Sequence, residues 1–172
     1  MAKKHYLNDF EMQENGKYAY AGSSYAFAGT KEELKKAYVK LLVILVLLIA
    51  SFIAAGFITG GGMKNSFYVI LPYIGEAAAL FFSAYYTVRL FLKGDTVREY
   101  VYNQTAKRMP NAFTIVAFFA AAGLICSLAF SISGGFKEEL LESILYLVFK
   151  AADIALALSF ANSFRSLEWL KI

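Results

Sequence analysis

Residues 41–63 read LLVILVLLIASFIAAGFITGGGM, a run of 23 residues without a charged side chain. About 20 consecutive apolar residues are needed for a helix to cross a hydrocarbon layer about 30 Å thick. A helix suits this environment because it satisfies its own backbone hydrogen bonds in lipid. The run therefore predicts a membrane-spanning helix, and it is too long for the apolar core of a cleavable signal peptide.

Three further segments have the same character. They are residues 65–88, 112–136 and 143–164. The first of these contains one charged residue, Glu76, and the last contains Lys150 and Asp153. None shows the alternation typical of a membrane barrel. We therefore predict an all-α integral membrane protein with a four-helix transmembrane bundle. The expected spans are about 38–60, 66–92, 112–134 and 140–164.

The composition agrees with this class. Hydrophobic residues make up 59% of the 172 residues, charged residues make up 17%, and the mean hydropathy is +0.51. A soluble domain is typically about 45–50% apolar and about 25% charged. One histidine and one cysteine argue against zinc, haem and iron–sulfur sites and against a disulfide framework. We therefore expect no metal and no other cofactor.

Basic residues are divided very unevenly between the two sides of the predicted bundle. With four crossings, the N-terminal segment, the connection between the second and third spans, and the C-terminus share one side. That side holds 14 basic residues, whereas the other holds only Lys64 and Lys137. The excess predicts a multi-pass protein of the cell membrane with both termini in the cytoplasm. It also explains the net charge of +4 without nucleic acid as a partner, because a basic face suits anionic lipid headgroups.

Residues 1–30 are predicted to form a small cytoplasmic segment that resembles a β-hairpin. Asn15-Gly16 is typical of a tight hairpin turn, and residues 17–27 alternate around aromatic side chains. An isolated hairpin is marginally stable in water, so we expect it to pack on other cytoplasmic segments or on a partner.

The membrane domain is predicted to cover residues 31–172. Thr30 and Glu33 match a capping box, in which a Thr side chain and a Glu three residues later satisfy the first free N–H groups of a helix. A helix is therefore expected to begin after Thr30 and to continue into the first span.

Residues 93–111 are predicted to form an amphipathic cytoplasmic connection on the inner leaflet. Thr96 and Glu99 give a second capping-box match. Pro110 is expected to end the short helix, and Asn111 can cap the third span.

Four residues are candidates for contact with the anionic lipids of the inner leaflet, because basic and tryptophan side chains favour the headgroup region. They are Arg98, Lys107, Arg108 and Trp169. Trp169 belongs to the C-terminal tail, which we expect to act as an interface anchor.

The charges within the spans are the most informative residues. Each costs about 2.5–3.5 kcal/mol near the bilayer centre and is expected to face protein or water. Glu76 lies ten residues after Ser66, and Lys150 lies eleven after Glu139, so both are about 15 Å deep at 1.5 Å per residue. We therefore predict that Glu76 contacts Lys150, with Asp153 on the other side of the amine.

The fourth span carries these groups on one polar face. At 100° per residue, Glu142, Tyr146, Lys150 and Asp153 fall on one side of the helix. Together with Glu76 they form a candidate buried charge cluster. Two carboxylates against one ammonium leave one negative charge, which a proton or a cation can balance. Such a cluster can handle ions, or it can be a structural device that fixes the register of the helices.

Catalysis is not indicated by the sequence. It contains no Ser–His–Asp set, Cys–His pair, HExxH motif, P-loop or GxGxxG motif. We expect a non-catalytic subunit or adaptor whose cytoplasmic face binds a protein partner, or a homo-oligomer. The alternative is a small proton- or cation-coupled transporter or channel that uses Glu76, Lys150 and Asp153.

Overall fold

The computed structural model of the 172-residue chain describes residues 10–12, 18–20, 22–58, 66–133 and 140–172. The predicted turn at Asn15-Gly16 lies outside the described residues. The chain is mostly helical, and two small sheets accompany the helices.

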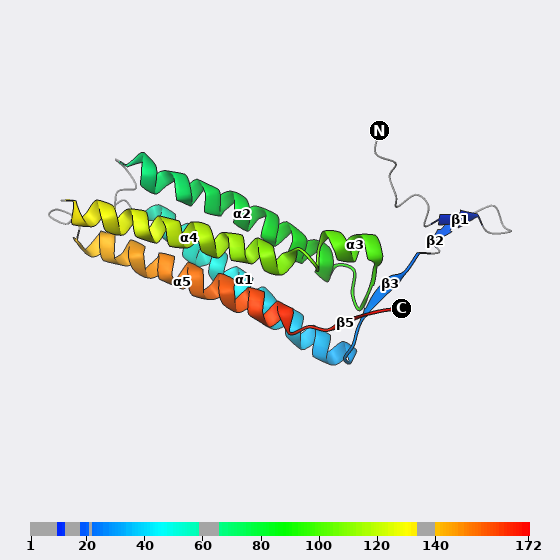
Figure 1. Cartoon of the computed structure of the whole chain (residues 1–172). Coiled ribbons are helices and arrows are strands. Elements are labelled where there is room, and N and C mark those ends of the chain that lie inside the picture. Colours follow the sequence, from blue (N-terminus) through cyan, green and yellow to red (C-terminus); the bar gives the residue numbers. More distant parts are fainter. Residues whose placement is uncertain (1–9, 13–17, 21, 59–65, 134–139) are drawn as a thin grey trace, which may run out of the picture.

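Four long apolar helices dominate the structure (Figure 1), as the sequence predicts. They are α1 (Lys31–Phe57), α2 (Phe67–Phe91), α4 (Met109–Ile132) and α5 (Leu140–Arg165). Each is long and apolar enough to cross a membrane. A short helix, α3 (Glu99–Gln104), precedes α4.

The helices form a bundle in which α4 packs against both α2 and α5. Helix α1 packs on the other side of α5 and touches α2 only sparsely. Phe113 of α4 stacks on Phe160 of α5 with 3.7 Å between ring centroids, in the centre of the apolar core. The seam between α1 and α2 is therefore the least closely packed helix pair around the bundle.

Large apolar side chains also cover the outside of the helices. Val46, Phe81, Ile125 and Val148, one from each long helix, are each more than half exposed. Water would not favour such a surface, but the acyl chains of a bilayer would. The polar side chains buried within the same helices face the interior, as expected for helices in lipid.

The start of α1 follows the predicted capping box. The Glu33 backbone N–H donates to Thr30 Oγ1 at 3.2 Å, and the Thr30 N–H donates to Glu33 Oε2 at 2.8 Å. These bonds satisfy two backbone donors that the first turn of a helix leaves free. The prediction that a helix begins after Thr30 is confirmed.

At one end of the bundle, three distant parts of the chain form an antiparallel sheet (Figure 1). Its central strand is β3 (Ser24–Phe27), which lies between β4 (Thr96–Arg98) and β5 (Trp169–Lys171). Separately, β1 (Phe10–Met12) pairs with β2 (Tyr18–Tyr20). Residues 24–27 thus pair with the middle connection and the C-terminal tail, and not with the N-terminal strands.

Two local predictions in the connection are wrong. Thr96 does not cap a helix but begins β4, because Val97 is buried in the core and the strand pairs with β3. Pro110 does not separate two helices either. It lies in the first turn of α4, which begins at Met109, so Asn111 is not the cap. Proline is tolerated there because the first turn needs no backbone donor.

Candidate functional site

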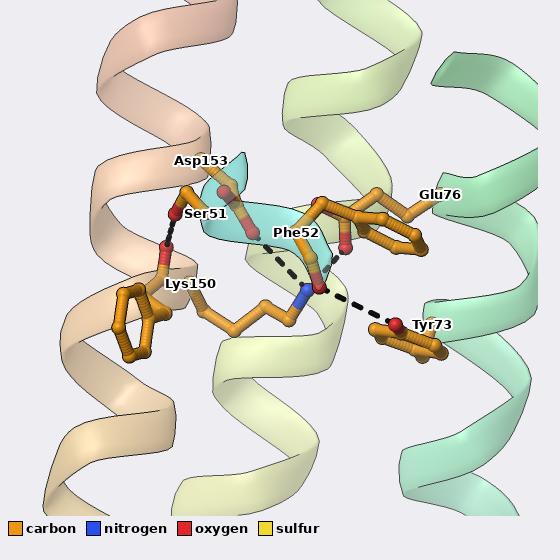
Figure 2. A network of polar contacts seen from close by, with 7 residues as sticks. Ser51, Phe52, Tyr73, Glu76, Lys150 and Asp153 are labelled. Carbon is orange, nitrogen blue, oxygen red and sulfur yellow. Dashed lines mark hydrogen bonds and ion pairs between the residues drawn. The ribbon is translucent and has the colours of Figure 1, made fainter. Parts of the chain in front are cut away.

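Lys150 is the centre of an ion cluster buried among the helices (Figure 2). Its Nζ donates to Glu76 Oε2 at 2.7 Å and to Asp153 Oδ2 at 3.2 Å. All three side chains are 0% exposed. The predicted contact between Glu76 and Lys150 is present in the structure, with Asp153 as the second partner. We call Glu76, Lys150 and Asp153 the buried triad.

The triad forms because of helix periodicity and a small residue on α4. Lys150 and Asp153 are three residues apart on α5, so they lie on the same face. Gly123 lies on α4, where an added Cβ would be 3.7 Å from Lys150 Cδ and 3.8 Å from Pro72 Cβ of α2. The missing side chain at Gly123 thus lets the lysine pass close to α4 toward Glu76 on α2.

Three aromatic rings surround the Lys150 amine. Its Nζ lies 4.8 Å from the ring centroid of Tyr73, 5.2 Å from Phe52 and 5.6 Å from Tyr146. A cation within about 6 Å of an aromatic face is attracted by the negative charge of that face. The rings therefore compensate part of the lost hydration of the amine and exclude water from it.

The Phe52–Tyr73 pair also joins α1 to α2, the pair of helices with the fewest contacts. The two rings stack with 4.5 Å between centroids, and the Tyr73 hydroxyl donates to the Phe52 carbonyl at 3.3 Å (Figure 2). The sequence analysis missed both residues. Tyr73 lies three residues before Glu76 on the same helix, which is a usable signal, whereas nothing in the sequence connects Phe52 to the triad.

Several polar atoms around the triad have no hydrogen-bond partner among the described residues. They are Glu76 Oε1, Asp153 Oδ1 and the Tyr146 hydroxyl, all buried. Two carboxylates and one ammonium also leave one formal negative charge in this cluster. A proton on one carboxyl group would balance that charge. Within the described part of the chain, no group of three His, Cys, Asp or Glu side chains could hold a metal ion.

The remaining residues of the predicted cluster lie at different distances from the triad. Tyr146 is fully buried one turn before Lys150, and its ring faces the amine. Glu142 belongs to the first turn of α5, is partly exposed and lies two turns before Lys150. The structure therefore brings Tyr146 to the triad and leaves Glu142 near the end of the helix.

The four predicted lipid-contacting residues lie near the sheet. Arg98, Lys107 and Arg108 are exposed, as expected for side chains that meet headgroups or water. Trp169 is partly buried, and its ring lies 6.1 Å from the rings of both Phe27 and Tyr102. It therefore packs between the sheet and α3.

Two surface pockets of about 360 Å³ each are present, and neither is lined by a triad residue. The first, which we call the α1–α2 pocket, lies near the sheet. Its lining residues are Lys31, Leu34, Lys35, Tyr38, Val39, Leu42, Phe91, Gly94 and Asp95. The second lies between α2 and α4 and includes Gly75, Phe82 and Phe119.

Comparison with known proteins gives no assignment. No protein-family model matches the chain, and neither the curated proteins nor the solved structures include a match.

Proposed function

We propose that this chain is a non-catalytic subunit or adaptor of the cell membrane, and that a partner protein binds it at the sheet end. The sheet end comprises β3, β4, β5 and α3. In this proposal both termini are cytoplasmic. The 14 basic residues on the side of the termini, against two on the other side, support this orientation.

The observation that carries the proposal is the outer face of β5. Side chains alternate along a strand, so Leu170 and Ile172 share one face and Trp169 and Lys171 share the other. Leu170 is 57% exposed and Ile172 is 68% exposed. Because β5 is an edge strand of its sheet, it offers free backbone groups beside these apolar side chains. A partner that adds a strand or an apolar surface would cover both.

The sheet end is firmly attached to the bundle, as a docking surface requires. Val97 of β4 and Val101 of α3 are buried in the same apolar core as the helices, and Trp169 packs against that core. The three strands come from the N-terminal part, the middle connection and the C-terminal tail. A partner bound here would therefore contact all the chain segments on this side of the bundle.

The buried triad supports a structural role over a transport pathway. Its side chains have no exposed surface, and neither of the two pockets reaches them. A buried ion cluster can specify which helices pack together and in which register. On this view, the triad maintains the bundle that carries the sheet end.

Complexes purified from native membranes test the proposal. The wild-type chain is expected to purify with a partner at fixed stoichiometry, measured by native mass spectrometry. The double variant Leu170→Ser and Ile172→Ser should lose that partner. The control is Leu92→Ser, which removes an 80% exposed leucine at the same end of the bundle but outside the sheet. Purification of the wild type only as a lone protomer would refute the proposal.

One observation favours a second candidate function, proton- or cation-coupled transport. The triad carries an uncompensated negative charge and two carboxylate oxygens without partners among the described residues. In this alternative Glu76 exchanges a proton or cation during transport. Glu76→Gln should then abolish ion flux in liposomes while the protein stays folded, and unchanged flux would eliminate the alternative.

A further inference from the structure

The α1–α2 pocket combines an apolar wall with a basic rim. Val39 and Leu42, both about half exposed, belong to α1, and Phe91 closes α2. Tyr38 stacks on Phe91 with 4.0 Å between ring centroids, so the base of the pocket is aromatic. Lys35 lies one turn closer to the start of α1 than Val39.

The two lysines of the rim differ in their partners. Lys31 Nζ lies 3.0 Å from Asp95 Oδ2, and this bond holds the pKa of the Asp95 carboxyl below its usual value. Asp95 therefore stays ionised and compensates the charge of Lys31. Lys35 is exposed and has no ion pair with any described residue. The pocket thus presents one uncompensated positive charge above its apolar wall.

This vertical order of charge and apolar surface matches a lipid. The rim lies at the start of α1, where a membrane-spanning helix meets the headgroup region, and the apolar wall continues along the helix toward the hydrocarbon. Lysine side chains at helix ends extend toward headgroups, and each contributes about 1 kcal/mol of attraction to an anionic surface. The sparse contact between α1 and α2 leaves room for an acyl chain along the seam.

We propose that the α1–α2 pocket binds a phospholipid with an anionic headgroup. The headgroup phosphate pairs with Lys35, and the first part of an acyl chain lies on Val39 and Leu42. Charge complementarity at Lys35 selects the anionic headgroup, and the apolar wall requires the attached chain. The inference rests on the helices crossing a membrane, and it is independent of whether a protein partner binds the sheet end.

Native mass spectrometry of the full chain in detergent tests this site with phosphatidylglycerol and phosphatidylcholine as probes. The wild type should retain one phosphatidylglycerol in preference to phosphatidylcholine. Lys35→Gln should lower this preference about fivefold, the loss expected for one lysine facing an anionic headgroup. Inorganic phosphate added in excess should not displace the lipid, because it lacks the chain.

Two matched controls separate the pocket from general surface effects. Lys36→Gln removes the same charge from the next residue of α1, which does not line the pocket, and should retain the preference. Val39→Trp should fill the pocket and reduce binding of both lipids, whereas Val43→Trp, one turn further and outside the lining, should not. Equal losses in Lys35→Gln and Lys36→Gln, or unchanged lipid binding in Val39→Trp, would overturn the proposal.

Discussion

Lys150 shows how a charged residue can be accommodated inside an apolar bundle. Its amine has two carboxylate partners and three aromatic rings within 6 Å. Transfer of an isolated charge to such a place would be very costly, so each partner matters. The stability of the cluster therefore depends on its balance more than on any one of its bonds.

Removal of the amine alone should be strongly destabilising. Lys150→Met leaves Glu76 and Asp153 buried without their cation, and breaking a buried ion pair in this way typically costs about 3–5 kcal/mol. The triple variant Glu76→Gln, Lys150→Met and Asp153→Asn contains no charge and should recover most of this loss. Denaturant unfolding in detergent measures both. A triple variant no more stable than Lys150→Met would contradict the balance argument.

At the scale of the elements, glycines determine how closely α4 can approach its neighbours. A Cβ at Gly75 of α2 would lie 2.5 Å from Phe119 Cε1 of α4, which is too close for unaltered packing. A Cβ at Gly123 of α4 would meet its neighbours at 3.7–3.8 Å, an ordinary contact. The two positions therefore differ in their tolerance for a methyl group.

Alanine at these two glycines should have opposite effects. Gly75→Ala forces Phe119 or the helices to move, and overpacking of this kind typically costs about 1–3 kcal/mol. Gly123→Ala fits without displacement and should be neutral or slightly stabilising, because alanine favours the helix. Thermal unfolding in one detergent compares them directly. Equal melting temperatures for the two variants would show that α2 and α4 do not approach as described.

The three-stranded sheet can be tested through the single tryptophan of the chain. Ser24 N–H donates to the Ile172 carbonyl and Ala28 N–H to the Glu168 carbonyl, both at 3.0 Å, so the alternation of antiparallel bonds assigns the Ala26 N–H to β5 as well. Ala26→Pro removes this donor from the central strand.

Ala26→Pro should detach β5 and expose Trp169 to water. The expected result is a red shift of tryptophan emission and stronger quenching by acrylamide, with the helical circular dichroism unchanged. Ala26→Gly keeps the N–H and serves as the control. Unaltered emission from Ala26→Pro would mean that Trp169 does not depend on the sheet for its packing.

Across the whole molecule, local patterns predicted more than long-range pairings. Four long apolar runs gave four helices, and depth counting with helix periodicity placed Glu76 beside Lys150. The sheet was missed because β3, β4 and β5 are only three or four residues long, and their pairing joins segments about 70 residues apart. Phe52 was missed for the same reason, since its place at the triad depends on how α1 packs.

The central claim is that Glu76 and Lys150 are interacting neighbours sealed inside the helix bundle. A double-mutant cycle of Glu76→Gln and Lys150→Met, measured by unfolding in detergent, tests it most directly. Residues in contact typically show coupling energies of about 0.5–3 kcal/mol, and we predict a favourable coupling at the upper end of this range because both groups are fully buried. Additive effects of the two substitutions would contradict the account.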